Sequence, residues 1–216
     1  MLEMKTFSSR DGWLAGRSGR IGGSEASAII GMNPYKTNVE LWEEKTGKRI
    51  PDDISEKPYV LYGTLAEDHL RELFKLDYPQ FSVDYVENNL WINSEKPFAH
   101  ASLDGWLTDE NGRKGILEIK STNILQSIQR EKWNHRIPDN YFVQVLHYLL
   151  VTGWDFAILK AQLKYDYDGD IFLTTKHYVI ERADVLEDLE FLEEQERAFY
   201  ESIKAGKKPN LVLPNI

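Results

Sequence analysis

Cysteine is absent from the 216-residue sequence, and this absence removes several classes of site at once. Disulfides, thiolate zinc sites, iron–sulfur clusters and cysteine nucleophiles are all excluded. Any metal must therefore be held by carboxylates or histidines. Hard, oxygen-preferring cations become the leading candidates for such a site.

Long apolar runs are also missing. No stretch approaches the roughly 18 residues that span a bilayer, and no charged-then-apolar signal stands at the N-terminus. We therefore expect a cytoplasmic protein. No internal repeat, low-complexity tract or flexible linker interrupts the sequence, so we expect residues 1–216 to form a single domain.

Basic residues are fewer than acidic ones, 26 against 35, so the formal net charge is −9. This balance argues at first against a nucleic-acid partner, since phosphate contacts need lysine and arginine. The acids are concentrated near the C-terminus, however: residues 181–201 hold nine acids against two arginines, whereas residues 5–50 hold eight bases against five acids. The net charge is consequently a poor guide to the charge of any one site.

The spacing of apolar residues predicts helices toward both ends of the chain and strands between them. Helices are expected near residues 24–30, 39–47, 58–76, 138–152 and 184–204, and strands near 81–86, 90–92, 103–108, 115–121, 156–165 and 171–180. The N-terminal region as a whole is expected to form short helices. Residues 141–152 are apolar almost all round, so that helix should be buried. This order of elements indicates an α/β or α+β core with a mixed central sheet flanked by helices.

The hairpin between residues 103 and 121 is the most informative segment. Asn111-Gly112 is a strong turn signal, and a loop of three or five residues makes paired residue numbers sum to 222. That register places Asp104 opposite Glu118, and alternation along the strand puts Lys120 on the same face. Leu117 and Ile119, in turn, should point into the core.

Two carboxylates that face each other repel, and one pKa rises unless a cation lies between them. A divalent metal is therefore the economical explanation for this pair. A solvated hairpin face is the alternative, because exposed strand faces normally carry such residues. The Glu-x-Lys spacing also occurs at residues 3–5 and 43–45, so the tripeptide alone proves little.

Five short blocks extend this pattern from about Trp13 to Tyr178. They are Arg17-x6-Ser24, Gly63-Thr-Leu-Ala-Glu67, Leu103-Asp-Gly105, Leu117-Glu-Ile-Lys120, and Tyr141-Phe-Val-Gln144 before an apolar helix. In this order they resemble the PD-(D/E)xK nuclease superfamily, and more specifically the phage exonucleases of the lambda-exonuclease or YqaJ viral-recombinase type. The proline expected before Asp104 is replaced by Leu103. The resemblance implies a restriction-endonuclease-like core.

The resemblance also implies roles for individual residues. The implied catalytic residues are Glu67, Asp104, Glu118, Lys120 and Gln144, and the implied metal ligands are Asp104, Glu118, the Ile119 carbonyl and Glu67. The metal would be Mg²⁺, with Mn²⁺ as a substitute. Outside the resemblance, Glu67 fits a solvent-facing helical position and Gln144 a packing hydrogen bond.

Arg17 and Ser24 resemble the pocket that holds a terminal 5′ phosphate in this family. Ser24 follows two glycines near an expected helix start, where free N–H groups favour an anion and Arg17 can add a bidentate contact. A helix cap beside a surface arginine is the alternative. His100 and His147 each lack a second histidine at ligand spacing, so we expect them to be structural or substrate-adjacent.

The leading hypothesis is a Mg²⁺-dependent 5′→3′ exonuclease that acts on linear double-stranded DNA ends and leaves 3′ single-stranded tails for phage-type recombination. The resemblance further implies a homotrimer, a single-strand annealing protein as partner, and a phage or prophage gene in a bacterial host. Two alternatives remain open: an endonuclease of the same superfamily, and a DNA-end-binding module without catalysis.

Overall fold

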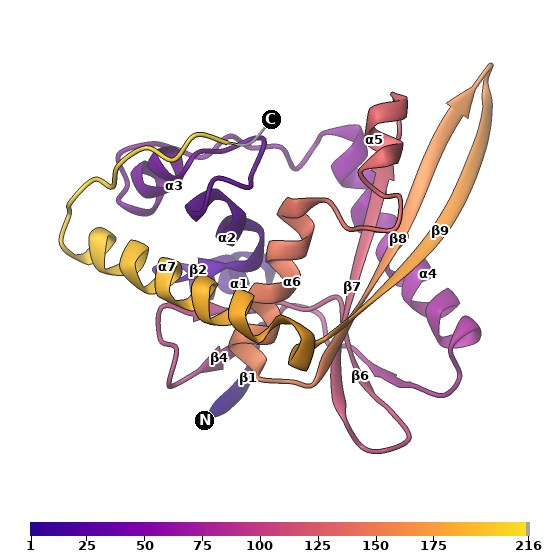
Figure 1. Cartoon of the computed structure of the whole chain (residues 1–216), viewed down its shortest axis with the longest axis horizontal. Coiled ribbons are helices and arrows are strands. Elements are labelled where there is room, and N and C mark those ends of the chain that lie inside the picture. The colour runs from indigo at the N-terminus through magenta and orange to yellow at the C-terminus, as the bar shows by residue number, and fades with distance from the viewer. Residues whose placement is uncertain (215–216) are drawn as a thin grey trace.

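A five-stranded sheet forms the centre of the computed structural model, which describes residues 1–214 (Figure 1). Its strand order is β3-β6-β7-β8-β9. The bounds are Ser82–Asp84 for β3, Gly105–Thr108 for β6, Lys114–Asn123 for β7, Phe156–Tyr167 for β8 and Asp170–Glu181 for β9. β7 and β8 run parallel and the other neighbours are antiparallel, which confirms the expected mixed sheet.

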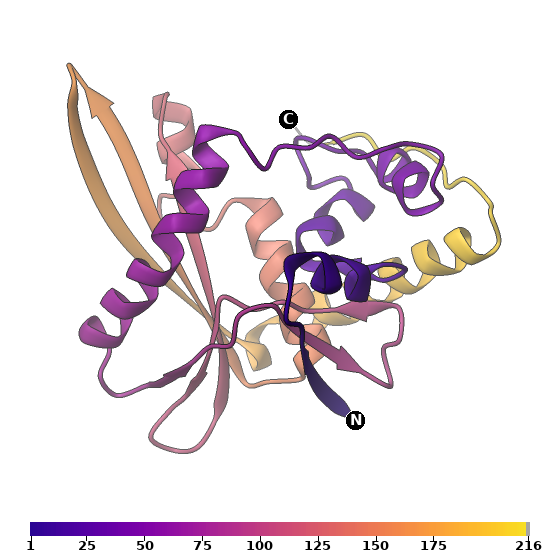
Figure 2. The ribbon, with the colours of Figure 1, turned by 180° about the vertical axis from the view of Figure 1, so that it is seen from behind.

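Helices cover both faces of this sheet. Their bounds are Arg10–Arg17 for α1, Gly23–Ile29 for α2, Asn38–Lys45 for α3, Pro58–Asp77 for α4, Ser127–Glu131 for α5, Asp139–Thr152 for α6 and Leu186–Lys204 for α7. A 3₁₀ turn over Arg182–Val185 leads into α7. α4 crosses in front of the sheet in Figure 2, whereas α6 and α7 lie on the other side. The helices expected at residues 24–30, 39–47, 58–76, 138–152 and 184–204 are thus confirmed.

β7 separates the two cores by the alternation of its side chains. Leu117 and Ile119 pack with Leu70 and Phe74 of α4 in the smaller core. Ile116, the residue before Leu117, faces the larger core, which contains α6. Leu117 and Ile119 are therefore buried, as expected from the hairpin pattern.

α6 runs through the interior of the molecule. Every residue from Val143 to Thr152 is buried, as its nearly all-apolar sequence predicts. The helix ends where Gly153 adopts a left-handed conformation with φ of 71°, a position that glycine occupies without the strain of a Cβ. Any polar side chain on α6 must accordingly find its partner inside the protein.

Two small strand pairs lie outside the main sheet. β1 (Leu2–Thr6) pairs antiparallel with β4 (Asn89–Asn93), and β2 (Ile21–Gly22) pairs parallel with β5 (Ala99–His100). The expectation of short helices throughout the N-terminal region is correct for α1 and wrong for β1. β1 is exposed over most of its length and its partner is distant in sequence, so its local pattern is weak.

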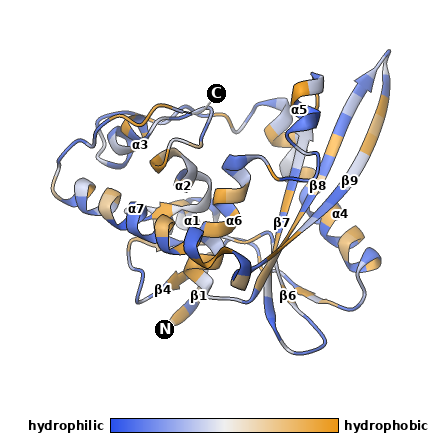
Figure 3. Ribbon diagram, viewed as in Figure 1, coloured by the Kyte–Doolittle hydropathy of each residue, from blue (hydrophilic) through white to orange (hydrophobic). Residues whose placement is uncertain are grey.

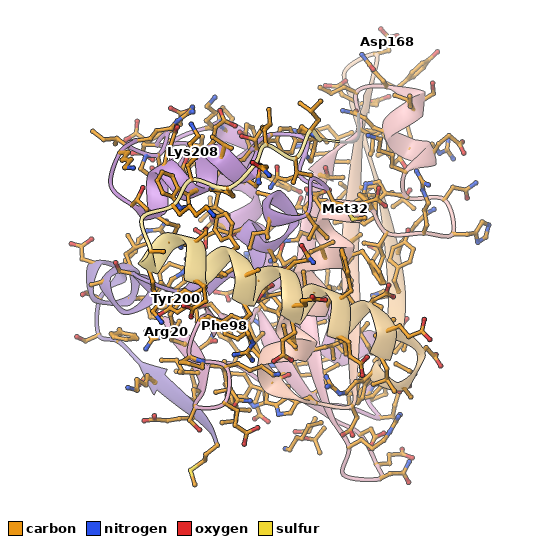
Figure 4. All side chains as sticks on the ribbon, turned by 60° about the vertical axis from the view of Figure 1, so that its left-hand side comes forward. Arg20, Met32, Phe98, Asp168, Tyr200 and Lys208 are labelled. Carbon is orange, nitrogen blue, oxygen red and sulfur yellow. The ribbon has the colours of Figure 1, made fainter. Side chains whose placement is uncertain are left out.

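α7 closes the molecule on the side of the larger core. Figure 3 shows polar and apolar residues alternating along this helix, and its apolar side includes the buried Leu189, Leu192 and Phe199. Figure 4 looks onto α7, where the rings of Phe98 and Tyr200 lie 6.3 Å apart between centroids. The same view shows Asp168 at the far end of the β8–β9 hairpin, which projects from the body. Within residues 1–214 no helix has the length and apolar character needed to cross a membrane.

Candidate active site

The β6–β7 hairpin has the predicted register. Gly105 pairs with Leu117 and Trp106 with Ile116, so paired residue numbers sum to 222. Asp104 lies just before β6 and its Oδ2 accepts a 2.8 Å hydrogen bond from the Ile119 amide. The turn chemistry and the alternation of the two strands therefore bring Asp104 beside Glu118, in the middle of β7.

Glu118 is buried rather than solvated, with an exposed fraction of 1%. Its Oε1 accepts a hydrogen bond from Gln144 Nε2 at 2.8 Å and lies 2.6 Å from Lys120 Nζ. Its Oε2 is also buried and finds no hydrogen-bond partner among the described residues. This burial excludes the alternative of a solvated hairpin face.

The electrostatics of the site follow from several charges in a buried space. Burial, together with the Asp104 carboxyl, raises the pKa of Glu118 to about 8 despite the opposing effect of Lys120. Burial likewise raises the pKa of Asp104. Burial alone would lower the pKa of Lys120, but Glu118 and Asp104 outweigh it and raise that pKa above its ordinary range. The charge of Lys120 therefore offsets only part of the cost of burying the two acids side by side.

Glu67 reaches the same region from α4 but has a partner of its own. Its Oε1 lies 2.8 Å from Arg71 Nη2, and burial together with Asp104 raises its pKa to about 8. Over the described part of the chain, no three His, Asp or Glu side chains are grouped so that they could hold a metal ion. The structure therefore joins Asp104 and Glu118 and leaves Glu67 on Arg71, so a role for Glu67 at a metal would run through water.

The donor set at Asp104 and Glu118 nevertheless suits a hard divalent cation. Carboxylate oxygens are the ligands that Mg²⁺ prefers, and Mg²⁺ usually keeps several waters beside one or two protein carboxylates. The partnerless Oε2 of Glu118 supplies a buried acceptor that such an ion would satisfy. The main-chain carbonyl of Ile119, between Glu118 and Lys120, is the remaining expected ligand.

A cavity of about 420 Å³ opens beside the carboxylates of Asp104 and Glu67. The residues that line it are Arg10, Trp13, Arg17, Thr64, Glu67, Asp68, Tyr85, Glu87, Asn88, Asn89, Ser102, Leu103, Asp104 and Tyr148. They come from α1, α4, α6, the first residue of β4, the connection between β3 and β4, and the segment before β6. Arg17 and Asp104 therefore share one cavity, although they are far apart in sequence.

Arg17 is oriented by its neighbours in α1. Its guanidinium carbon lies 4.2 Å from the centroid of the Trp13 ring, and Trp13 Nε1 donates to the Asn89 carbonyl at 3.0 Å and to Ser102 Oγ at 3.2 Å. A Cβ added to Gly22 would meet Arg17 Nη2 at 3.4 Å. The close approach of Arg17 to the Gly22 main chain thus agrees with the expected placement of the two.

Ser24 is placed differently from Arg17. It is the second residue of α2, as its sequence context predicts, but its side chain is exposed. Among the residues described, those that line the cavity include Arg17 and not Ser24. The amide of Gly22, at the start of the same helix, donates to Glu25 Oε2 at 2.9 Å, so this N–H already has a partner.

Two residues of the site were not expected from the sequence. Arg71 contacts Glu67 from the next turn of α4, and Tyr148 accepts a 2.9 Å hydrogen bond from Gln144 across one turn of α6. Each follows an expected site residue by four positions, which is the spacing of neighbours on a helix face. This four-residue spacing could have indicated from the sequence that Arg71 lies beside Glu67 and Tyr148 beside Gln144.

The chain is similar to proteins of one family along most of its length. The model of the YqaJ-like viral recombinase domain matches residues 12–155. The uncharacterized protein YqaJ of Bacillus subtilis (strain 168) is 35% identical over 213 residues, which are 98% of this chain and 62% of that protein. The chain thus spans less than two thirds of the length of this curated relative.

Solved structures share the arrangement of elements at lower identity. An alkaline exonuclease from Laribacter hongkongensis superposes with a TM-score of 0.66 and 21% identity, covering 91% of this chain and 93% of that one. A phage related exonuclease from Haemophilus somnus 129PT gives a TM-score of 0.54 and 14% identity, covering 87% and 96%. At these identities the likeness concerns the fold, and it agrees with the mixed sheet and flanking helices described above.

Proposed function

The chain belongs to the YqaJ-like viral recombinase domain family, and from this premise and the geometry of its buried carboxylates we propose that it is a nuclease acting on DNA. The observation that carries the proposal is Glu118. Its Oε1 is shared by Lys120 and Gln144, its Oε2 is buried without a partner among the described residues, and Asp104 lies beside it. A structural ion pair has no need of a second, unsatisfied carboxylate at this place.

The residues of the chain divide the chemistry among them. Asp104, Glu118 and the Ile119 carbonyl would hold Mg²⁺, or Mn²⁺ in its place, and the bound ion would activate water and supply positive charge at the scissile phosphate. Lys120 stays cationic because Glu118 and Asp104 raise its pKa, so it can offset phosphate charge and orient the attacking water. Gln144 fixes the rotamer of Glu118 through its 2.8 Å hydrogen bond.

The proposed reaction is 5′→3′ degradation of one strand from the ends of linear double-stranded DNA, which leaves 3′ single-stranded tails. Arg17 supports it, because it lines the same cavity as Asp104 and can anchor a terminal 5′ phosphate beside the carboxylates. Ser24, which is exposed on α2, would have to reach the phosphate from outside this cavity. Solved proteins with the same fold carry the name exonuclease, which adds support for this class of reaction.

The proposal extends to the setting of the reaction. We place residues 1–216 in one nuclease domain that assembles as a homotrimer, works beside a single-strand annealing protein, and is encoded by a phage or prophage of a bacterial host. Exposed leucines on α4 favour an assembly, since Leu61, Leu65 and Leu76 would otherwise face water. The recombinase family supports a role in DNA recombination.

One assay tests the function. The protein is incubated with linear and with closed circular double-stranded DNA, in Mg²⁺ and in chelator. We expect Mg²⁺-dependent loss of the linear substrate alone, and loss of activity by about 100-fold or more in Asp104→Asn, Glu118→Gln and Lys120→Met. Cutting of closed circles would favour an internal nuclease, and DNA-end binding without cleavage would favour a non-catalytic module.

A further inference from the structure

Arg71 is a buried arginine, 4% exposed, whose contacts include residues that line the cavity. Each of its three nitrogens donates to a different acceptor. Nη2 lies 2.8 Å from Glu67 Oε1, Nη1 lies 2.6 Å from Asp68 Oδ1, and Nε donates to the main-chain carbonyl of Asp104 at 2.5 Å. The guanidinium therefore bridges α4 and the segment that carries Asp104.

A fourth contact fixes the plane of the same group. The guanidinium carbon of Arg71 lies 3.5 Å from the centroid of the Tyr85 ring, a cation–π arrangement. Tyr85 follows β3 and lines the cavity together with Glu67 and Asp104. Arg71 itself is not among the described residues that line the cavity, so it acts on a bound molecule only through its neighbours.

We propose that Arg71 is the positioning residue of the acidic centre: it holds the Glu67 carboxylate and the Asp104 main chain in the relative position that a divalent cation requires. This inference rests on the proposed metal-dependent nuclease function. Residues that orient metal ligands typically affect metal affinity as strongly as they affect activity, although they do not touch the ion.

The positioning role of Arg71 depends on the shape of its guanidinium as well as on its charge. A guanidinium is a planar fork that can donate in several fixed directions, whereas a lysine ammonium is a point charge on a flexible stem. Arg71→Lys therefore keeps the positive charge while losing the simultaneous contacts to Glu67, Asp68 and Asp104. A purely structural arginine would instead affect only the stability of the fold.

The test measures binding of Mn²⁺ in the absence of DNA. Isothermal titration calorimetry with MnCl₂ compares the wild type with Arg71→Lys, and thermal unfolding of both proteins is recorded alongside. We expect Arg71→Lys to stay folded and to bind Mn²⁺ about 10- to 100-fold more weakly. Arg113→Lys is the matched control, because Arg113 also joins two carboxylates, those of Asp109 and Glu181, on an exposed surface.

Three results would overturn the inference in distinguishable ways. Wild-type protein that binds no Mn²⁺ would reject the metal centre and, with it, the role of Arg71. Wild-type binding that Arg71→Lys leaves within a factor of about three, below the 10-fold expected, would reject Arg71 alone, even if that variant unfolds at lower temperature. An equal loss of Mn²⁺ affinity in Arg113→Lys would show a general effect of altering an arginine.

Should Arg71→Lys fail to fold, Arg71→Gln, whose planar amide still donates, takes its place under the same criteria.

Discussion

Gln144 Nε2 donates a 2.8 Å hydrogen bond to Glu118 Oε1, joining the buried helix α6 to the central strand β7. The same amide nitrogen donates to Tyr148 Oη at 2.9 Å. Because Lys120 approaches the same oxygen of Glu118, Oε1 has two partners, whereas the buried Oε2 has none among the described residues. The conformation of the Glu118 side chain therefore depends on a contact from α6 as well as on its position in β7.

Gln144→Leu should test this coupling. The substitution removes a donor from a buried carboxylate and should cost about 1–3 kcal/mol in the free energy of unfolding. It should also reduce cleavage by about 10- to 100-fold, because Glu118 loses part of its orientation. Urea denaturation and single-turnover cleavage measure the two effects. Gln195→Leu, on α7, is the control, and unchanged cleavage in Gln144→Leu would contradict the role assigned to the amide.

The buried pair His147 and Glu196 predicts how stability depends on pH. His147 is fully buried, its Nδ1 lies 2.6 Å from Glu196 Oε1, and its Nε2 lies 2.8 Å from the His100 carbonyl. Burial alone would lower the pKa of His147, but Glu196, with smaller contributions from the His100 carbonyl and then Glu25, raises it above its ordinary 6.5. The folded protein therefore binds this proton more tightly than the unfolded chain.

The stabilisation by this pair is fully present below pH 6.5 and is lost as the pH rises through the higher pKa of folded His147. The neighbouring His100 ring has a pKa lowered by burial and by Arg17 to about 2, so it stays neutral throughout. We expect the free energy of unfolding to fall as the pH rises from 6.5 through the pKa of folded His147, and to fall less in His147→Gln. Urea denaturation without metal provides the measurement. An identical pH dependence in the variant would show that other groups are responsible.

The hairpin shows how far sequence reasoning reaches in this molecule. Its register depends on a local turn signal and on strict alternation, so Asp104 and Glu118 could be paired from residue numbers alone. α6 was also predictable from local sequence, because an apolar helix of its length must be buried. An amide on such a helix predicts a packing hydrogen bond, whereas the site role of Gln144 is implied by the family resemblance; in the structure its partner is Glu118.

Contacts between distant segments were beyond that reasoning. The bond from Arg71 Nε to the Asp104 carbonyl spans 33 positions, and no periodicity encodes it. β1 was missed because its partner β4 lies far along the chain and its own side chains are mostly exposed. For Ser24 the position at the start of a helix was predictable from its neighbours, whereas its absence from the cavity lining depends on tertiary packing.

The acidic surface of α7 should have little influence on DNA binding. The cavity is lined from α1, α4, α6 and neighbouring segments, and Glu190 and Glu194 are exposed on α7. Glu193 differs from them because it is paired with Lys96 and Arg197. The double variant Glu190→Gln/Glu194→Gln should change DNA affinity by less than about twofold at moderate salt, where distant surface charges are screened. A large gain in affinity, measured by fluorescence anisotropy, would place α7 against the DNA.

The chemistry of the DNA end should decide the rate if Arg17 anchors a terminal phosphate. The guanidinium stacks on Trp13 and shares its cavity with Asp104, so a bound phosphate would set which phosphodiester bond reaches the carboxylates. Linear duplex with a 5′ phosphate should therefore be digested much faster than the same duplex with a 5′ hydroxyl. Arg17→Ala should remove most of this preference and retain slow cleavage, because the carboxylates and Lys120 remain.

The measurement compares both substrates with wild type, Arg17→Ala, Ser24→Ala and the distant control Arg113→Ala. Arg17→Ala should lower the rate on the phosphorylated end alone, since a single charge-assisted contact to phosphate is worth about 1.5–3 kcal/mol. Ser24→Ala separates two arrangements: a matching loss means that the α2 start reaches the phosphate, and wild-type behaviour means that the cavity residues suffice. Equal wild-type rates on both ends would contradict the phosphate anchor. Efficient digestion of closed circles would do the same, because such DNA has no end for Arg17 to hold.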